Sequence, residues 1–238
     1  MGMKTEEKMI IKGRRLDGRE PDELREIEMK VGVIPNANGS AQVSFGNTVA
    51  IAGVYGPRLL HPKHLQRADT AILQCRYNMA PFSVDERASP GPSRRSIEIS
   101  KVTRLALEPA LFLEEYPETV VDVYIEILQA DGSTRVTGIN AASLALADAG
   151  VPMRDLVVAL SGGKIDETPI IDLNGKEDNY SVADIPFAFM PRKKEITLLQ
   201  MDGLLTPDEI KSIFKNLLKA GQTIYEMQKQ ALRKKYEE

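Results

Sequence analysis

The alternation of apolar and polar residues along the chain predicts many short β-strands separated by a few helices. Strands are expected at 28–34, 40–45, 48–55, 70–77, 120–129, 156–160, 170–173, 182–190 and 196–201. One helix is expected from Ser93 to about Leu113, with a bend near Pro109, and a second, rich in small residues, over 141–149. This order of elements predicts an α+β protein of two similar halves built around mixed sheets.

The last element has the clearest pattern. Thr206, Pro207 and Glu209 supply an N-cap, a proline at the first helical position and a capping-box glutamate. From Ile210 to Leu232, apolar residues recur at helical spacing and form one stripe. We therefore expect a long C-terminal helix whose apolar stripe packs on the core.

The length of 238 residues suits one large domain, and no segment is long or polar enough to mark an internal boundary. We expect a single domain over 14–238, preceded by a flexible arm at 1–13. No apolar run approaches the roughly 20 residues that span a bilayer, and the start of the chain is charged. These features predict a cytoplasmic protein with no membrane contact. The single Cys75 excludes an intramolecular disulfide and a cysteine-based zinc cluster.

The net charge of −3 argues against a nucleic-acid partner, but the charge is unevenly distributed. Residues 57–104 contain nine Lys and Arg against four Asp and Glu, so this segment carries +5 and the remainder −8. Both histidines lie in the same segment. Within it, Lys63, His64 and Arg67 form a basic loop that suits a polyanion better than a metal ion. A solvated face would explain such a block as well as an anion-binding surface does.

Two predicted helices begin with arginine. Arg94 and Arg95 follow Ser93, and Arg135 follows Thr134. The start of a helix carries partial positive charge and free N–H groups, so arginine is unfavourable there unless an anion binds at the same place. Two such starts in two halves of one fold favour a shared phosphate pocket, although arginines at a helix start often extend into solvent.

The residues before the second helix have the arrangement of a phosphate loop. Gly132, Ser133 and Thr134 connect a predicted strand to that helix, where backbone N–H groups can hold a phosphate. The spacing is not that of a nucleoside-triphosphate-binding loop, and no Gly-x-Gly-x-x-Gly opens a helix. Hydrolysis of nucleoside triphosphates and dinucleotide binding are therefore not expected.

Asp178 and Asp184 are the candidate catalytic acids. Asp184 lies in an otherwise apolar strand, where a carboxylate is costly unless it is paired or binds a metal. Alternation places it on the face opposite Ala183 and Ile185. Asp178 lies in a polar turn, where an exposed acid is ordinary. Two nearby acids can hold a divalent cation or divide acid and metal roles between them.

With these residues in place, the chain resembles the ribonuclease PH family and, within it, the catalytic ring subunits of archaeal exosomes. The matching stretches are Arg15-Leu16-Asp17-Gly18-Arg19, Gly39-Ser40-Ala41, Gly46-Asn47-Thr48, Gly56-Pro57-Arg58, Arg94-Arg95, Asp131 to Arg135 and Asp178 to Pro186. The resemblance implies a ribonuclease PH-like (ribosomal protein S5 domain 2-like) fold, with two βαβα-like halves and a long C-terminal helix.

The resemblance also implies an activity, namely 3′-to-5′ exoribonuclease action by phosphorolysis, in which inorganic phosphate releases nucleoside diphosphates. Carried over to this sequence, Ser133, Thr134, Arg135 and Arg95 bind phosphate. Arg94, Arg95, Lys63, His64 and Arg67 bind RNA. Asp178 and Asp184 are the catalytic acids and hold a divalent metal, expected to be Mg²⁺.

The partners implied are single-stranded RNA, a homologous inactive ring subunit that alternates with this chain in a hexamer (a trimer of dimers), and RNA-binding cap proteins. Two other interpretations remain open. The chain can be a non-catalytic RNA-binding scaffold of the ring, or a stand-alone ribonuclease PH that trims the 3′ ends of tRNA as a homohexamer.

Overall fold

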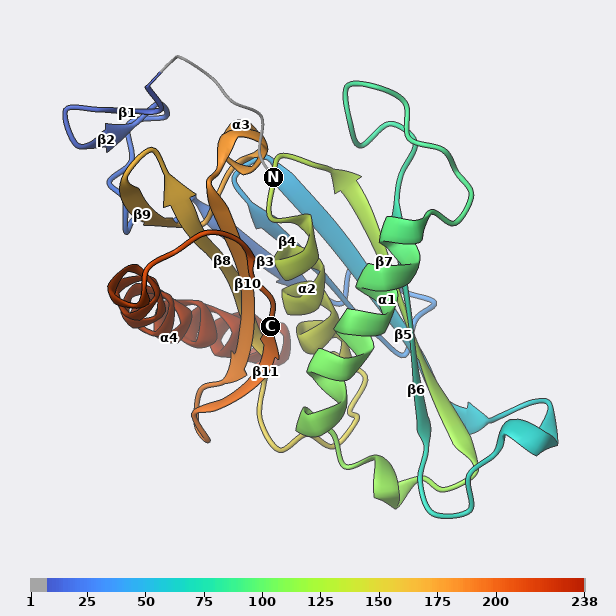
Figure 1. Ribbon diagram of the computed structural model, residues 1–238. Coiled ribbons are helices and arrows are strands. Elements are labelled where there is room, and N and C mark those ends of the chain that lie inside the picture. Colours follow the sequence, from blue (N-terminus) through green and yellow to red (C-terminus); the bar gives the residue numbers. More distant parts are fainter. Residues whose placement is uncertain (1–7, 238) are drawn as a thin grey trace.

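The computed structural model describes residues 8–237, and its first half is organised on a five-stranded sheet (Figure 1). The strands follow the order β3-β4-β5-β7-β6 across the sheet. Their bounds are Ile27–Val31 for β3, Gly39–Phe45 for β4, Thr48–Leu59 for β5, Ile72–Met79 for β6 and Thr119–Gln129 for β7. Neighbouring strands are antiparallel except β6 and β7, which run parallel and place the helix that joins them on one face.

The second half contains a smaller antiparallel sheet of order β11-β10-β8-β9, with β12 paired to β10. The bounds are Val158–Ile165 for β8, Thr168–Ile171 for β9, Ala183–Met190 for β10, Glu195–Leu199 for β11 and Asp202–Gly203 for β12. Gly162 in β8 is required by close packing, because a Cβ there would lie 2.6 Å from Ile213 Cγ2 of the last helix. The absence of a side chain at Gly162 therefore lets that helix lie on the sheet.

Helix α2 (Thr134–Asp148) packs between the two sheets (Figure 1). Thirteen of its 15 residues are buried, and many of them are small, which lets strands approach it from several sides. Gly39 of β4 comes so close that a Cβ would lie 2.1 Å from Ala149 N, just after the helix. One apolar cluster contains residues of both sheets and of α2, so the two halves share a core.

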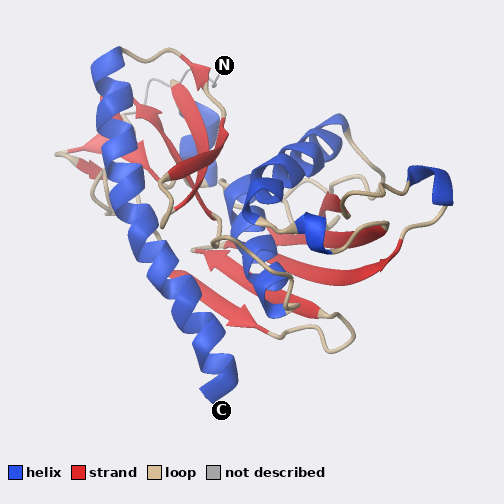
Figure 2. Cartoon of the chain, turned by 90° about the horizontal axis from the view of Figure 1, so that it is seen from below, coloured by secondary structure: helices blue, strands red, loops and turns tan. Residues whose placement is uncertain are grey.

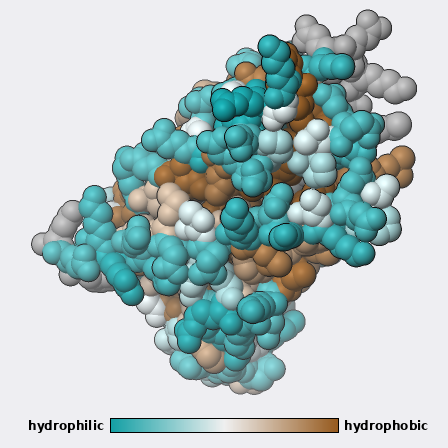
Figure 3. All heavy atoms as spheres, turned by 90° about the vertical axis from the view of Figure 1, so that its left-hand side faces the viewer, coloured by the Kyte–Doolittle hydropathy of each residue, from teal (hydrophilic) through white to brown (hydrophobic). Residues whose placement is uncertain are grey.

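Helix α1 (Arg94–Leu107) lies beside α2 over the first sheet and ends before Pro109. Helix α4 (Pro207–Glu237) runs along one side of the molecule and contacts both β8 and β3, so it connects the two sheets (Figure 2). Its lysines at 211, 215 and 219 face solvent, as the amphipathic pattern predicts. Figure 3 shows a mainly hydrophilic face interrupted by apolar patches. Within residues 8–237, no helix has both the length and the apolar composition needed to cross a bilayer.

The expected α+β class and the two-half arrangement are confirmed, but several local predictions are wrong. The helix expected to reach about Leu113 ends at Leu107, and the helix expected over 141–149 begins at Thr134. The polar turn expected around Asp178 is a short helix, α3 (Gly175–Tyr180), which begins with a capping box between Asn174 and Glu177. The strand expected at 156–160 extends as β8 to Ile165.

The flexible arm expected at 1–13 falls partly outside the described residues, which begin at Lys8. The part that is described is folded. Strand β1 (Ile10–Ile11) pairs with β2 (Arg14–Arg15), and Met9 is buried against Ile165 and its neighbours. Burial of Met9 therefore corrects the prediction of an arm for these residues.

Candidate active site

The start of α2 presents unpaired backbone donors. Ser133 adopts a left-handed conformation (φ 55°), and Gly132 before it has φ 72°. The Ser133 hydroxyl does not cap the helix; it contacts Ser161 Oγ (2.7 Å) and donates to the Leu173 carbonyl (2.7 Å). Among the residues that the structure describes, no acceptor bonds the N–H groups of Thr134, Arg135 or Val136. A helix start of this kind favours an anion.

Close contacts with Tyr77 and Asn174 fix the position of this helix start. The Tyr77 hydroxyl donates to Thr134 Oγ1 at 2.9 Å, and burial raises the pKa of Tyr77, so the phenol stays protonated. Gly132 passes close to Asn174, whose carbonyl carbon would lie 2.5 Å from a Cβ at position 132. Only glycine fits this approach, and its positive φ favours glycine as well.

Arg135 is held by two polar side chains. Its guanidinium donates to Glu98 Oε2 at 2.9 Å and to the Gln200 carboxamide oxygen. Gln200 Nε2 in turn donates to Glu98 Oε1 at 3.1 Å, which closes the set of three side chains. Glu98 lies on α1 and Gln200 follows β11, so contacts from both halves of the protein orient Arg135.

The start of α1 is built differently. Ser93 accepts from Ser96 N (3.0 Å), and the Ser96 hydroxyl accepts from Ser93 N (2.8 Å), so a capping box pairs the N–H groups of these two serines. Arg94 and Arg95 occupy the first helical positions and are exposed. Neither forms an ion pair with the described residues, which leaves both guanidinium groups available to a ligand.

Asp178 on α3 and Asp184 on β10 line the same cavity as Arg95 and Arg135. Burial and the charge of Asp178 raise the pKa of Asp184 to about 7, although Arg135 and Arg95 act in the opposite direction. Burial also raises the pKa of Asp178, while Arg95 and Arg135 lower it. At neutral pH, Asp184 is therefore divided between its protonated and ionised forms, as a proton donor must be.

The cavity measures about 510 Å³ and is open to solvent. The two acids, Arg95, Arg135 and Gln200 line it. A smaller recess of about 80 Å³ shares the two acids and both arginines and adds the start of α2. A liquid water occupies about 30 Å³, so the recess suits one small anion beside the larger cavity.

Two family models match this chain. Residues 23–152 match domain 1 of the 3′ exoribonuclease family, and residues 155–219 match domain 2. The chain belongs to the 3′ exoribonuclease (ribonuclease PH) family. The boundary between the two matches coincides with the change from the first sheet to the second.

Relatives of this exoribonuclease family member extend over nearly its whole length. It is 63% identical to exosome complex component Rrp41 of Pyrococcus furiosus over 94% of this chain and 90% of that protein. It is 59% identical to the Rrp41 component of Thermococcus onnurineus over 99% and 95% of the two chains.

Solved structures of low identity show the same fold. Rice Rrp46 superposes with a TM-score of 0.82 at 24% identity, over 92% of this chain and all of that one. A chain of the Archaeoglobus fulgidus exosome with RNA bound to the active site gives a TM-score of 0.78 at 24% identity, over 90% and 92%. The ribonuclease PH-like fold is thus confirmed.

In this exoribonuclease, the donor set of the cavity fits a hard divalent cation. Asp178 and Asp184 supply carboxylate oxygens, and each has its pKa raised because burial disfavours its charge. Within residues 8–237, no group of three or more His, Cys, Asp or Glu side chains forms a metal cluster. Two carboxylates suit Mg²⁺, which usually keeps several waters and is completed by phosphate oxygens.

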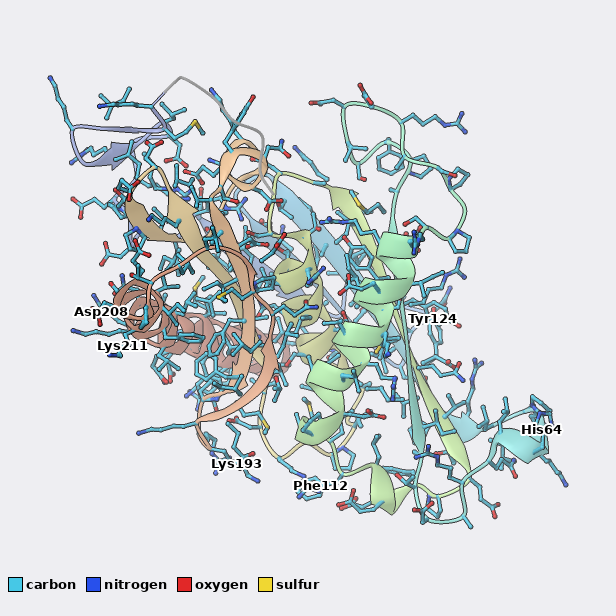
Figure 4. The ribbon with its side chains drawn as sticks, viewed as in Figure 1. His64, Phe112, Tyr124, Lys193, Asp208 and Lys211 are labelled. Atoms are coloured by element: carbon cyan, nitrogen blue, oxygen red, sulfur yellow. The ribbon has the colours of Figure 1, made fainter. Side chains whose placement is uncertain are left out.

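The structure brings together Ser133, Thr134, Arg135, Arg95, Asp178 and Asp184. Arg94 precedes Arg95 on α1 and lines neither cavity. It does not bring the basic loop to this place. Lys63 and His64 lie in a short 3₁₀ turn (Lys63–Leu65), and Arg67 follows it, all exposed at the far end of the first sheet (Figure 4).

The length of strand β7 gives the distance between the basic loop and the cavity. Its first residue pairs with the end of β5 beside the basic loop, and its last residue precedes the start of α2. Its 11 residues span about 35 Å at roughly 3.3 Å per residue. The loop and the cavity therefore contact different parts of any long ligand. The basic segment as a whole is not one surface, since Arg58 pairs with Asp122 and Arg104 with Glu108.

Sequence reasoning missed Glu98 and Gln200. Glu98 lies one helical turn after Arg94 and Arg95, so its place on the cavity face of α1 could have been inferred from helical spacing. Gln200 follows a strand of the other half, and no local pattern in the sequence identifies it.

Proposed function

We propose that this chain is the catalytic subunit of an exosome ring and degrades single-stranded RNA from its 3′ end by phosphorolysis. Its exoribonuclease family and its high identity to Rrp41 components support the assignment to an exosome. One observation carries the chemistry: a helix start that favours an anion adjoins two half-buried carboxyls, and arginines from two helices line the same recess.

Phosphate binds in the recess at the start of α2. The N–H groups of Thr134, Arg135 and Val136 supply donors to its oxygens, and Arg135 and Arg95 supply positive charge. Fixed donors that face the position where negative charge develops are typically the largest contribution to catalysis of phosphoryl transfer. A hydrolase needs a site for the scissile phosphate alone, so a second anion site beside the acids favours phosphate as the attacking group.

In the proposed step, one bond to phosphorus forms and one breaks. An oxygen of inorganic phosphate forms a bond to the phosphorus of the terminal phosphodiester, and the bond from that phosphorus to the 3′ oxygen of the preceding nucleotide breaks. Asp184, whose pKa of about 7 lets it hold a proton, protonates the leaving oxygen. The proton of the hydrogen phosphate then returns to Asp184. The products are a nucleoside diphosphate and an RNA one nucleotide shorter.

Asp178 and Asp184 would hold a divalent cation, with Mg²⁺ as the proposed ion. When bound, such a cation neutralises charge on the phosphoryl oxygens. Burial raises the pKa of Asp178, and Arg95 is the charge that opposes this shift most.

Arg94 and Arg95 would bind the phosphates near the 3′ end. Lys63, His64 and Arg67 would contact RNA further upstream, because about 35 Å separates them from the cavity. The assembly would contain a homologous inactive ring subunit in a hexamer, a trimer of dimers, with RNA-binding cap proteins, and would act in the cytoplasm.

Product analysis tests the proposal. The chain alone, and the chain combined with its candidate ring partner, are incubated with RNA labelled at its internal phosphates and Mg²⁺, with and without inorganic phosphate. We expect nucleoside diphosphates to form only when phosphate is present. Nucleoside monophosphates in the absence of phosphate would overturn phosphorolysis.

The same experiment separates the two alternatives. RNA binding without any turnover in the reconstituted ring would favour a non-catalytic scaffold. A homohexamer active without a second protein would favour a stand-alone tRNA-trimming enzyme. Asp184→Asn is the matched negative control, because it keeps the shape of the side chain and removes its proton chemistry.

A further inference from the structure

The segment before the first sheet contains an arginine whose every donor is used. Arg15 is 3% exposed and donates from Nε to Glu177 Oε1 (2.7 Å), while Nη2 bonds Glu177 Oε2. Its remaining bonds go to the carbonyls of Ile171 (2.7 Å), Asp172 (2.7 Å) and Glu23 (3.3 Å). A guanidinium has five N–H donors, so this set saturates it.

Glu177 links Arg15 to Asp178, one of the two proposed catalytic acids. Its carboxylate also accepts from Asn174 N at 2.9 Å, and its own N–H donates to Asn174 Oδ1 at 3.0 Å, so it closes the capping box of α3. Asp178 is the next residue, and its N–H donates to the Asn174 carbonyl at 2.8 Å. Helix α3 has only six residues and is too short to be stable by itself, so tertiary contacts must fix it.

A second arginine of the same segment contacts the phosphate loop. Arg25 is 9% exposed, pairs with Asp172 through Nη2 (2.7 Å) and Nε (3.0 Å), and donates to the Asp131 carbonyl at 2.7 Å. Asp131 directly precedes Gly132, and its carboxylate accepts from Gly175 N at 2.9 Å. The loop that begins α2 and the first residue of α3 are thus bonded to one another and to Arg25.

Stability alone does not account for this arrangement. Four charged side chains are buried together, those of Arg15, Arg25, Asp172 and Glu177. Removing such groups from water costs about as much as their attraction returns, so a buried ion pair adds little net stability over apolar side chains of the same volume. The planar guanidinium of each arginine instead fixes the direction of the groups that it bonds.

We propose that Arg15 and Arg25 are positioning residues for the two halves of the active site, Arg15 for Asp178 through Glu177 and α3, and Arg25 for the phosphate loop through Asp131. This inference rests on the proposed function. It assigns a role to the Arg15-Leu16-Asp17-Gly18-Arg19 stretch, which lies outside the cavity. Neither arginine contacts substrate. Each acts by fixing the place of a group that does.

The two arginines should affect different kinetic constants. Arg15→Lys keeps the charge but loses the fork, so Asp178 is displaced while the phosphate loop stays held by Arg25. We expect kcat to fall about 10- to 100-fold, since a displacement near 1 Å can cost about that much, with the KM for phosphate unchanged within two-fold. Arg25→Lys should raise the KM for phosphate about 10-fold and change kcat less.

Both variants are measured in the assembled ring by phosphorolysis. kcat is expressed per phosphate-binding site, as titrated calorimetrically with inorganic phosphate without RNA. This normalisation removes molecules that fail to fold. Arg14→Lys is the matched control, because Arg14 is the exposed neighbour of Arg15 in β2 and forms no ion pair within the described range. We expect it to behave as wild type.

The outcomes are separable. If wild-type ring is active and Arg15→Lys lowers only the melting temperature, with kcat per site unchanged, Arg15 is structural and the inference is overturned. Equal effects of both variants on kcat and KM would also overturn it. If wild-type ring forms no nucleoside diphosphate with phosphate, it is the proposed function that fails. Glu177→Gln should reproduce the kcat loss of Arg15→Lys, because it removes the same ion pair from the other side.

Discussion

The starts of α1 and α2 both place arginine at a helix start, yet they offer a ligand different things. At α1, the capping box of Ser93 and Ser96 occupies the third helical N–H group, and the side chains of Arg94 and Arg95 are exposed. At α2, Ser133 leaves the backbone donors free, and Arg135 is fixed by Glu98 and Gln200. One helix start thus forms a rigid anion site, and the other supplies mobile charge.

The two starts also act on different acids. Among the compensating charges, Arg95 lowers the pKa of Asp178 the most, whereas Arg135 lowers that of Asp184 more than Arg95 does. An arginine at a helix start therefore carries little information by itself. What distinguishes the two is whether a side chain caps the third helical N–H group and whether partners hold the arginine side chain.

The largest expected effect comes from the rigid site. Arg135→Met should lower kcat/KM for phosphate about 100- to 1,000-fold, because it removes a preorganised donor from a position where charge develops. Arg95→Met should lower it only about five-fold, since an exposed charge is screened by water. Initial rates at varied phosphate concentration measure both. Equal losses would contradict the contrast and show that α1 holds phosphate as firmly as α2.

Asp184, which lines the recess at the start of α2, should make the free energy of unfolding depend on pH. Folding raises the pKa of Asp184 from 3.8 to about 7, so between these values the native state binds more protons than the unfolded state. The free energy of unfolding should therefore fall as pH rises through about 4 to 7. Asp184→Asn removes this loss and should be more stable than wild type at pH 8 by about 2 kcal/mol, below the full value for three pKa units because the carboxyl retains some solvent contact.

Urea denaturation at pH 5 and pH 8, in buffer free of phosphate and divalent metal, checks the sign. Asp202→Asn serves as the comparison, because Asp202 lines the same cavity but is the weakest of the charges that act on Asp184. An Asp184→Asn variant with the same pH dependence as wild type would rule out a raised pKa.

The smallest effect concerns the cap of α1. Ser93→Ala removes the acceptor for Ser96 N and should destabilise the fold by about 1 kcal/mol. Since Ser93 lines neither cavity, the KM for phosphate should not change. Thermal unfolding and phosphate kinetics measure the two quantities. A raised KM would mean that the α1 cap shapes the phosphate site after all.

Periodicity was sufficient for the elements whose residues repeat. The apolar stripe of α4 and the apolar pattern around Asp184 predicted a helix and a strand correctly. It failed at α3, where six polar residues have no apolar period and only the capping pair Asn174 and Glu177 indicates a helix. It also ended β8 too early, because Gly162 and Gly163 resemble a turn when the close packing around them is not known.

The site was predicted where chemistry is local in sequence. Thr134 with Arg135, and Arg94 with Arg95, are neighbours that signal an anion by their place at a helix start. Glu98 and Gln200 act only because folding joins α1 to the end of β11, more than a hundred residues apart. Arg15 likewise meets Glu177 across 162 positions. No local sequence pattern predicts contacts between residues so far apart in the chain.

Helix α2 has one more consequence, which concerns motion. With 13 of 15 residues buried between two sheets, it cannot shift or rotate without moving most of the core. The phosphate recess at its start is therefore the stationary part of the enzyme. Any opening and closing during a catalytic cycle must come from the elements around it, namely α1, α3 and the exposed loop over 81–92. In the proposed reaction, the RNA end would move by one nucleotide after each turnover, and the attacking phosphate would return to the same place each time.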